Sequence, residues 1–222
     1  MEHWHPNPDF FFLPGAGPVL DIGPYYITNL VQLIGPVKRV TSLANATFET
    51  RTITTDCPRK GETVPVKTPT NIHALIEFQS GATITFSASW DIWAHRHANM
   101  ELYGIDGSLF VPDPNFFGGT LQASGANTTI EDVADWDHPF GVPNDDRHER
   151  PMANYRGAGL ADMANGIAAG RPHRCSFEMC LHVVEVMTSI VKAGEEGRWI
   201  DITTTCDRPE PLGPEDAKAL MA

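Results

Sequence analysis

The sequence has 222 residues, of which 41% are apolar and 20% are charged, and this composition suits one globular domain with a sizeable core. Its 16 basic and 28 acidic residues leave a formal charge of −12, which argues against nucleic acid or an anionic membrane as a partner. No apolar run approaches the roughly 20 residues that span a bilayer, and the N-terminus lacks a basic segment followed by an apolar one. We therefore expect a cytoplasmic protein without a membrane partner.

Residues 1–17 are rich in aromatic residues, proline and glycine and have no hydrophobic period, which predicts a loop packed on something else. A loop with so much aromatic surface should line a pocket or an interface, and we expect its His5 to contact a substrate. A helix is predicted from Pro18 to Ile34, where apolar residues cover nearly the whole circumference until Gly35 and Pro36 end the run. That pattern indicates a buried helix.

The next segments alternate or are rich in β-branched and aromatic residues, which predicts strands. Tight-turn residues at 80–81 and 106–107 predict antiparallel hairpins, and Pro65 places its strand at an edge. We expect one meandering sheet. The predicted strands are 37–47, 63–67, 71–79, 82–90, 99–103 and 108–112.

Residues 113–154 predict a long loop with ragged edge strands near 120–123 and 128–133. Helices are predicted at 159–169 and at 176–193. In the second helix one stripe should face the core, formed by Phe177, Cys180, Leu181, Val184, Met187 and Val191. A short strand at 199–203 and an acidic tail follow. Strands in a block flanked by helices predict an α+β fold over residues 1–222, with an open-faced, predominantly antiparallel sheet covered by helices on one face.

The pair of glycines Gly15 and Gly17 superficially resembles a dinucleotide-binding loop. No β-branched strand precedes it, however, and the third glycine and the later acidic residue of that fingerprint are missing. We therefore assign no cofactor-binding residue to this chain. The glycines instead allow a tight bend into the helix and the close approach of a ligand.

Asp21 and Tyr25 lie four residues apart, so they share one face of the predicted helix. Asp21 stands among residues otherwise too apolar for a carboxylate. It could satisfy free amides at the start of its own helix. Alternatively, the carboxylate and the phenol could act together on a substrate hydroxyl as an acid/base pair.

A second polar and aromatic cluster spans residues 90–97. We interpret this segment as a strand, in which alternation places Trp93, His95 and His97 on one face together with Asp91. Trp93 and His95 would then suit a sugar, whose ring faces are apolar and whose edges are polar. The same face could instead meet another subunit.

Two further groups of residues remain open to interpretation. The histidine pairs at positions 3 and 5 and at 95 and 97 could supply imidazoles to a metal. This spacing alone is weak evidence, so we assign no metal ligand. Arg156, with Tyr155 and Asn154 beside it, could bind a carboxylate or sugar hydroxyls, or could form a structural ion pair. His182 is expected to pack in its helix.

A family resemblance becomes specific at the predicted helix start. The sequence there is Gly15-Ala16-Gly17-x-x-x-Asp21-x-Gly23-x-Tyr25-x-x-Thr28. It is similar to the Gly-Gly-Gly-x-x-x-Asp-x-Gly-x-His-x-x-Asp signature that opens the C-terminal domain of Gfo/Idh/MocA oxidoreductases. The resemblance continues at residues 33–40, 103–109 and 156–163, so it extends over almost the whole chain.

In that family the Asp and His of the signature orient the substrate and assist proton transfer, while NAD(P) on an N-terminal Rossmann domain exchanges the hydride. By resemblance Asp21 takes the role of the Asp. Tyr25 replaces the His, and Thr28 replaces the second Asp. Because a phenol has a pKa near 10 and an imidazole near 6.5, Tyr25 should orient or donate to the substrate and should not act as a base at neutral pH.

The resemblance implies a substrate-binding and oligomerisation domain of a sugar or polyol oxidoreductase. Hydride transfer would require NAD(P) on a separate or missing Rossmann part. An open sheet face implies a homodimer or tetramer. The alternative is a stand-alone carbohydrate-binding protein, or a lyase or isomerase that uses the same pocket with or without a metal.

Overall fold

The structure of the chain, a computed structural model, describes residues 1–134, 137–146 and 151–221. The described chain forms two compact units: unit 1 comprises Met1–Ala94 and Phe177–Arg208, and unit 2 comprises His95–Ser176 and Pro209–Ala222. The single domain expected over residues 1–222 stays a prediction. Parts of the predicted long loop, at 135–136 and 147–150, lie outside the described residues.

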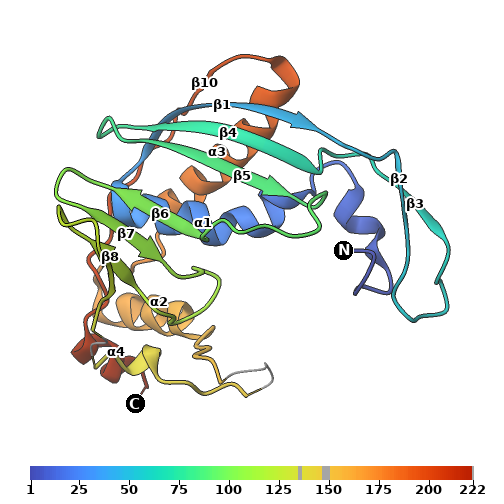
Figure 1. Cartoon of the computed structure of the whole chain (residues 1–222). Coiled ribbons are helices and arrows are strands. Elements are labelled where there is room, and N and C mark those ends of the chain that lie inside the picture. Colours follow the sequence, from blue (N-terminus) through green and yellow to red (C-terminus); the bar gives the residue numbers. More distant parts are fainter. Residues whose placement is uncertain (135–136, 147–150, 222) are drawn as a thin grey trace. The chain divides into compact units, whose positions relative to one another are not determined.

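Unit 1 is built on a four-stranded antiparallel sheet with the order β10-β1-β4-β5. Helices α1 and α3 lie on one face of the sheet and leave its other face open (Figure 1). This arrangement confirms the predicted α+β class with helices on one side. The elements are η1 (Pro8–Phe12), α1 (Pro18–Ile34), β1 (Val37–Asn45), β2 (Thr50–Thr52), β3 (Thr63–Pro65), β4 (Asn71–Phe78), β5 (Thr83–Ser89), α3 (Phe177–Glu196) and β10 (Ile200–Asp201).

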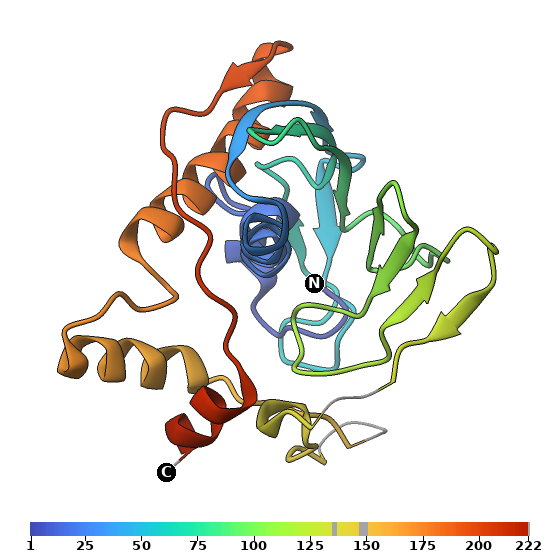
Figure 2. The ribbon, with the colours of Figure 1, turned by 90° about the vertical axis from the view of Figure 1, so that its left-hand side faces the viewer.

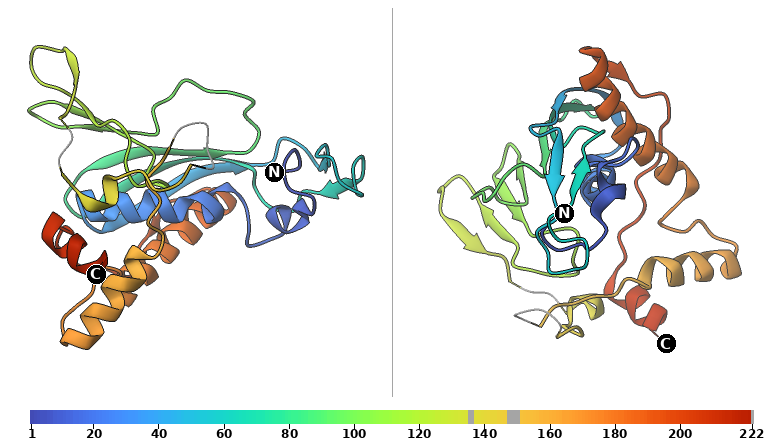
Figure 3. Two further views of the ribbon diagram at one scale, coloured as in Figure 1. Left: turned by 90° about the horizontal axis from the view of Figure 1, so that it is seen from below. Right: turned by 90° about the vertical axis from the view of Figure 1, so that its right-hand side faces the viewer.

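The predicted meander is interrupted in unit 1. Strands β2 and β3 leave the main sheet and pair only with each other. Pro65 lies in β3 and lacks the N–H that a central strand would need, so the predicted edge position is confirmed. The hairpin lies at one end of the unit, beside η1 and the N-terminal segment (Figure 3).

The predicted core stripe of α3 is correct only in part. Met187 is buried, but Phe177, Leu181 and Val184 are 73%, 44% and 50% exposed. Most of the buried residues lie on a side turned away from these three, and α1 packs alongside α3 there (Figure 2). Both faces of this helix are apolar, so hydrophobic period alone cannot choose between them. The buried apolar residues of α3 are Met179, Val183, Val186, Met187, Ile190 and Ala193.

Helix α1 has the bounds that the sequence predicts, but it is not buried all round. Gly23, Ile27 and Val31 face the core, whereas Ile22 and Leu33 are 37% and 42% exposed. Gly23 allows α3 to approach closely, since an added Cβ would lie 3.1 Å from the sulfur of Met187. The helix therefore buries one side and presents the other to solvent.

Unit 2 contains a second antiparallel sheet, with the order β6-β7-β8-β9, and two helices. Arg174 holds the end of the chain in place, because it donates to the carbonyl of Glu210 and pairs with Asp162 and Asp216. Within the acidic tail, Pro214 and the acidic residues after it begin a short helix. The elements are β6 (Met100–Tyr103), β7 (Ser108–Val111), β8 (Gln122–Ser124), β9 (Ile130–Asp132), η2 (Pro139–Gly141), α2 (Ala158–Ala169) and α4 (Pro214–Met221).

Among the described residues, every pair of hydrogen-bonded strands is antiparallel. Hairpins form at both predicted turns, between β4 and β5 and between β6 and β7. No helix in the described part of the chain is long and apolar enough to cross a membrane.

Candidate functional site

The start of α1 depends on a glycine that no other residue could replace without strain. Gly17 is the N-cap, with φ 103° and ψ 166°, a conformation available essentially to glycine alone. A Cβ at this position would lie 2.9 Å from the carbonyl oxygen of Pro69. Thr68 also donates to the carbonyl of Ala16. The segment before β4 therefore fixes the first turn of α1, which carries Asp21.

Asp21 is half-buried on α1, and its carboxylate makes no hydrogen bond or ion pair to another described residue. Burial raises the pKa of Asp21, and the positive charge of the Met1 amine partly opposes the shift. The expectation that Asp21 satisfies amides at its own helix start is not met, because no side-chain cap bond is present there. Its carboxylate is left available for a ligand.

Tyr25 lies one turn beyond Asp21 on the same side of α1 and is 37% exposed. The helical spacing brings the two residues onto one face, as the sequence predicts. This face is directed away from the buried residues Gly23, Ile27 and Val31.

His5 belongs to a cluster of aromatic rings at the N-terminus. Its ring packs edge-on against Trp4, Phe10 and Phe11, with centroid separations of 5.2, 5.3 and 5.5 Å. The Nδ1 atom of His5 accepts the backbone N–H of Asn7 at 3.0 Å. In a neutral ring the proton then resides on Nε2, which can donate to a ligand. The sequence singled out His5 but not the rings of Trp4 and Phe10 around it.

The predicted strand through residues 90–97 is wrong, because β5 ends at Ser89 and an irregular segment follows. Asp91 turns inward, where it pairs with Arg51 and accepts a hydrogen bond from Thr70 at 2.8 Å. Trp93 is 99% exposed. Asp91 and Trp93 therefore do not share one strand face, since alternation requires extended backbone that this segment lacks.

In unit 2, His95 is exposed, and its ring stacks on that of His97 at 6.3 Å. In the described part of the chain, no three His, Cys, Asp or Glu side chains lie close enough together to hold a metal ion.

Tyr155 and Arg156 are both engaged by the protein. The Tyr155 hydroxyl donates to the carbonyl of Val142 at 2.8 Å, and its ring packs on Phe140. Arg156 donates to the carbonyl and the side-chain oxygen of Asn115, both at 2.9 Å. These contacts favour a structural role for Tyr155. Arg156 also lines a polar hollow of about 480 Å³, together with Asn144, Asp145, Asp146 and Asn154.

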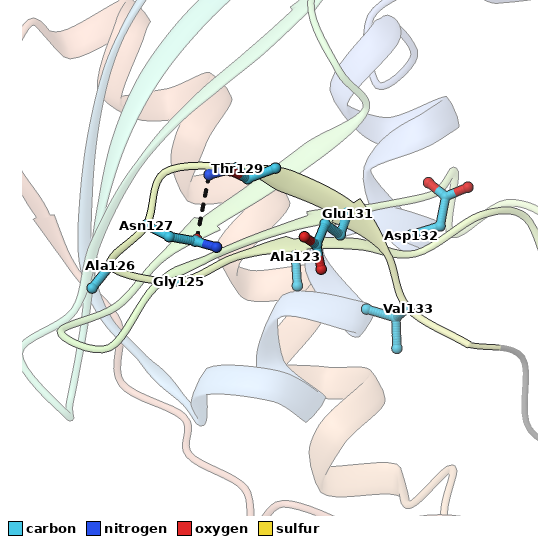
Figure 4. Close-up of a pocket in the computed structure, with 8 residues that line it drawn as sticks. All are labelled: Ala123, Gly125, Ala126, Asn127, Thr129, Glu131, Asp132 and Val133. Atoms are coloured by element: carbon cyan, nitrogen blue, oxygen red, sulfur yellow. Dashed lines mark hydrogen bonds between the residues drawn. The ribbon is translucent and has the colours of Figure 1, made fainter.

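A second hollow, of about 390 Å³, lies along the hairpin of β8 and β9 (Figure 4). Within it the side chain of Asn127 accepts the backbone N–H of Thr129. It contains none of the residues that the sequence singled out.

His182, expected to pack in its helix, is completely buried. Its Nε2 accepts the backbone N–H of Val37 at 2.9 Å, and its Nδ1 lies 3.1 Å from the Thr204 carbonyl oxygen. Burial lowers the pKa of His182, so the neutral ring joins α3 to the start of β1 and to the segment after β10. Its place is in the core and not in the candidate site.

Residues 1–110 match the family model described as the GFO/IDH/MocA C-terminal domain. None of the curated proteins matches the sequence. Among solved structures, levoglucosan dehydrogenase in its apo form superposes with a TM-score of 0.70 at 19% identity, over 92% of this chain and 57% of that one. The same enzyme has been solved in complex with NADH and levoglucosan.

Two other oxidoreductases resemble the chain to a similar degree. An oxidoreductase domain protein from Kribbella flavida has a TM-score of 0.63 at 22% identity, over 85% of this chain and 51% of that one. An aldose-aldose oxidoreductase from Caulobacter crescentus, solved with glycerol, has a TM-score of 0.60 at 22% identity, over 87% of this chain and 51% of that one.

The present chain thus spans only a little more than half the length of these enzymes. At this level of identity the likeness establishes the fold. Together with the family match, it confirms the resemblance that begins at Gly15: residues 1–110 match the model of the GFO/IDH/MocA C-terminal domain family, and the chain has the fold of the corresponding part of these oxidoreductases.

Proposed function

We propose that this chain is the substrate-binding and oligomerisation part of an NAD(P)-dependent sugar or polyol oxidoreductase. The observation that carries the proposal is Asp21, a half-buried carboxylate without a protein partner in the described chain, at a glycine-dependent helix start. A sugar hydroxyl donating to this carboxylate would supply the missing hydrogen bond. Tyr25 would orient the same substrate from the next turn.

The cofactor is assigned to a Rossmann part supplied separately. The strands of the described chain form only antiparallel sheets, whereas dinucleotides bind at the carboxyl ends of parallel strands. NADH accompanies the sugar in a levoglucosan dehydrogenase structure, and bound cofactor would supply hydride exchange here too. The role of this chain would be to position the substrate and to move a proton at its hydroxyl.

The proposal is tested by titrating the 222-residue chain with NAD⁺, NADP⁺ and a panel of aldoses and polyols in a calorimeter. We expect sugar or polyol binding without cofactor binding. Tight NAD(P) binding by the chain alone would overturn the assignment of the cofactor to another part. Absence of binding to every sugar and polyol would overturn the substrate-binding role.

Asp21→Asn provides the sharpest variant of this test. The amide keeps the shape of the carboxylate but loses its charge, so we expect at least about a tenfold loss of sugar affinity. Because burial raises the pKa of Asp21, the folded state holds the Asp21 proton more tightly than the unfolded state does. At neutral pH the ionised carboxylate therefore destabilises the folded state. The thermal midpoint should therefore stay unchanged or rise. A fall in midpoint with unchanged sugar affinity would identify Asp21 as structural.

A further inference from the structure

The N-terminal turn and η1 present two exposed aromatic rings around His5. Trp4 and Phe10 are each 53% exposed, whereas Phe11 beneath them is 8% exposed. The Phe10 ring lies 4.1 Å from that of Phe11 at an interplanar angle of 32°, so one face of Phe10 is covered. We refer to Trp4, His5 and Phe10 as the aromatic platform.

The platform is held rigidly from below. The backbone N–H groups of Trp4 and His5 both donate to the carbonyl of Met1, at 3.2 and 3.0 Å. Phe11 packs with Phe12, Ile53 and Val64 in a separate small core formed with the β2–β3 hairpin. Rings fixed in this way lose little conformational freedom when a ligand binds, which favours affinity.

The platform has a polar border. The Nε2 of His5 is left to donate, as described above. Beside Phe10, the Asp9 carboxylate pairs with the Arg59 guanidinium, and the same guanidinium contacts the side-chain oxygen of Asn7 at 3.3 Å. Aromatic faces bordered by donors and acceptors suit a sugar ring, which has apolar C–H faces and hydroxyls at its edge.

The platform precedes the helix start that carries the proposed substrate carboxylate. The carbonyl of Met1 receives the hydrogen bonds that close the turn of Trp4 and His5, and the chain runs from η1 through Gly17 into α1, where Asp21 lies in the first turn. In Figure 1, η1 lies between the start of α1 and the β2–β3 hairpin. Because η1 directly precedes α1 in the chain, we take a ligand with one ring at Asp21 to extend its second ring toward the platform.

We infer that Trp4, His5 and Phe10 form a second saccharide subsite, so that the preferred ligand is a disaccharide or glycoside and not a free monosaccharide. This inference rests on the proposed function, because it takes the first ring to lie at Asp21. Trp4 and Phe10 would contact the C–H face of the second ring, and the Nε2 of His5 would donate to one of its hydroxyls.

Calorimetric titrations of the 222-residue chain with glucose, galactose, cellobiose, maltose and lactose test the inference. We expect at least one disaccharide to bind about tenfold or more tightly than its component monosaccharides. Trp4→Ala and Phe10→Ala should each remove most of that preference and leave monosaccharide affinity unchanged. Trp4→Phe keeps an aromatic face and should retain most of the preference.

Phe177→Ala is the matched control, since Phe177 is an aromatic residue 73% exposed on α3 in the same unit, and it should change neither affinity. Equal affinity for monosaccharides and disaccharides would overturn the subsite and leave the proposed function standing. Absence of binding to all five sugars, and to the wider panel above, would overturn both. Concentration-dependent self-association abolished by Trp4→Ala would instead identify the platform as a contact between copies of the chain.

Discussion

At the scale of single residues, Gly17 connects the sequence most directly to the candidate site. Its positive φ turns the chain into α1, and its missing side chain lets the carbonyl of Pro69 approach. Gly15 also has a positive φ, of 85°, but an added Cβ there would meet nothing within 4 Å. An alanine at Gly15 would therefore meet only backbone strain, whereas an alanine at Gly17 would also clash with the carbonyl of Pro69.

Substitution of each glycine by alanine should show this difference. Gly15→Ala should lower the free energy of unfolding by about 1 kcal/mol, the usual cost of a left-handed conformation. Gly17→Ala should cost about 3 kcal/mol, because the backbone near Pro69 must also shift. Urea unfolding of both variants measures the two changes. Equal losses would show that the approach of Pro69 adds nothing to the strain.

At the scale of elements, the polar contacts of α3 tie it to the sheet and to the chain after β10. His182 makes the buried contacts described above. One turn later, Glu185 accepts hydrogen bonds from the backbone and hydroxyl groups of Thr203 and Thr204. Burial opposes ionisation of Glu185, but these hydrogen bonds prevail and lower its pKa to about 2.

These contacts predict two stages in the loss of stability toward acid. The pKa of His182 is depressed by burial, so the unfolded state takes up a proton first, and stability falls as the pH drops below the unfolded value of about 6.5. Glu185 contributes stability that is fully present above its ordinary pKa of 4.5 and is lost as the pH falls toward its folded-state pKa of about 2. Unfolding midpoints in urea between pH 8 and pH 3 should follow this course.

His182→Gln serves as the control for the first stage, because an amide cannot take up the proton. The variant should be less stable than the parent at pH 8, and its stability should change less between pH 6.5 and pH 5. If both proteins lose stability in parallel over that interval, another group is responsible.

At the scale of the whole molecule, the open face of the unit 1 sheet exposes apolar side chains that a protein partner could cover. Leu43 on β1 and Leu75 on β4 are 76% and 50% exposed. Trp199, 41% exposed, lies under the guanidinium of Arg39 at 4.6 Å. We predicted from the sequence that Trp93 and His95 lie on this face. However, β5 ends at Ser89, before either residue. On the same face as Leu75, β5 contributes the polar side chains of Thr83, Thr85, Ser87 and Ser89.

We expect this face to bring copies of the chain together as a homodimer or tetramer, since an apolar centre with a polar border is typical of protein interfaces. A Leu43→Asp and Leu75→Asp double variant should be monomeric in light scattering at concentrations where the parent associates. Leu160→Asp, at a residue 71% exposed on α2, is the matched control and should leave association unchanged. A monomeric parent protein at micromolar concentration would contradict the prediction.

Much of unit 1 could be predicted from the sequence because its signals are local. Proline and glycine mark both ends of α1, alternation marks β1 and β4, and turn residues mark the hairpin between β4 and β5. The pairing of Asp21 with Tyr25 on one face also follows from helical spacing alone. The family resemblance rested on the same local residues, and the family match over residues 1–110 confirmed it.

Tertiary structure decided what depends on contacts between distant segments. The core face of α3 was fixed by packing against α1 and β1, because both of its sides are apolar. Asp91 was drawn inward by Arg51, forty residues away, and the chain after Ser89 left the strand. The aromatic cluster around His5 likewise depends on a distant segment, because Phe11 packs against Ile53 and Val64 of the β2–β3 hairpin region. Such choices depend on burial and ion pairing over long loops, which local periodicity does not encode.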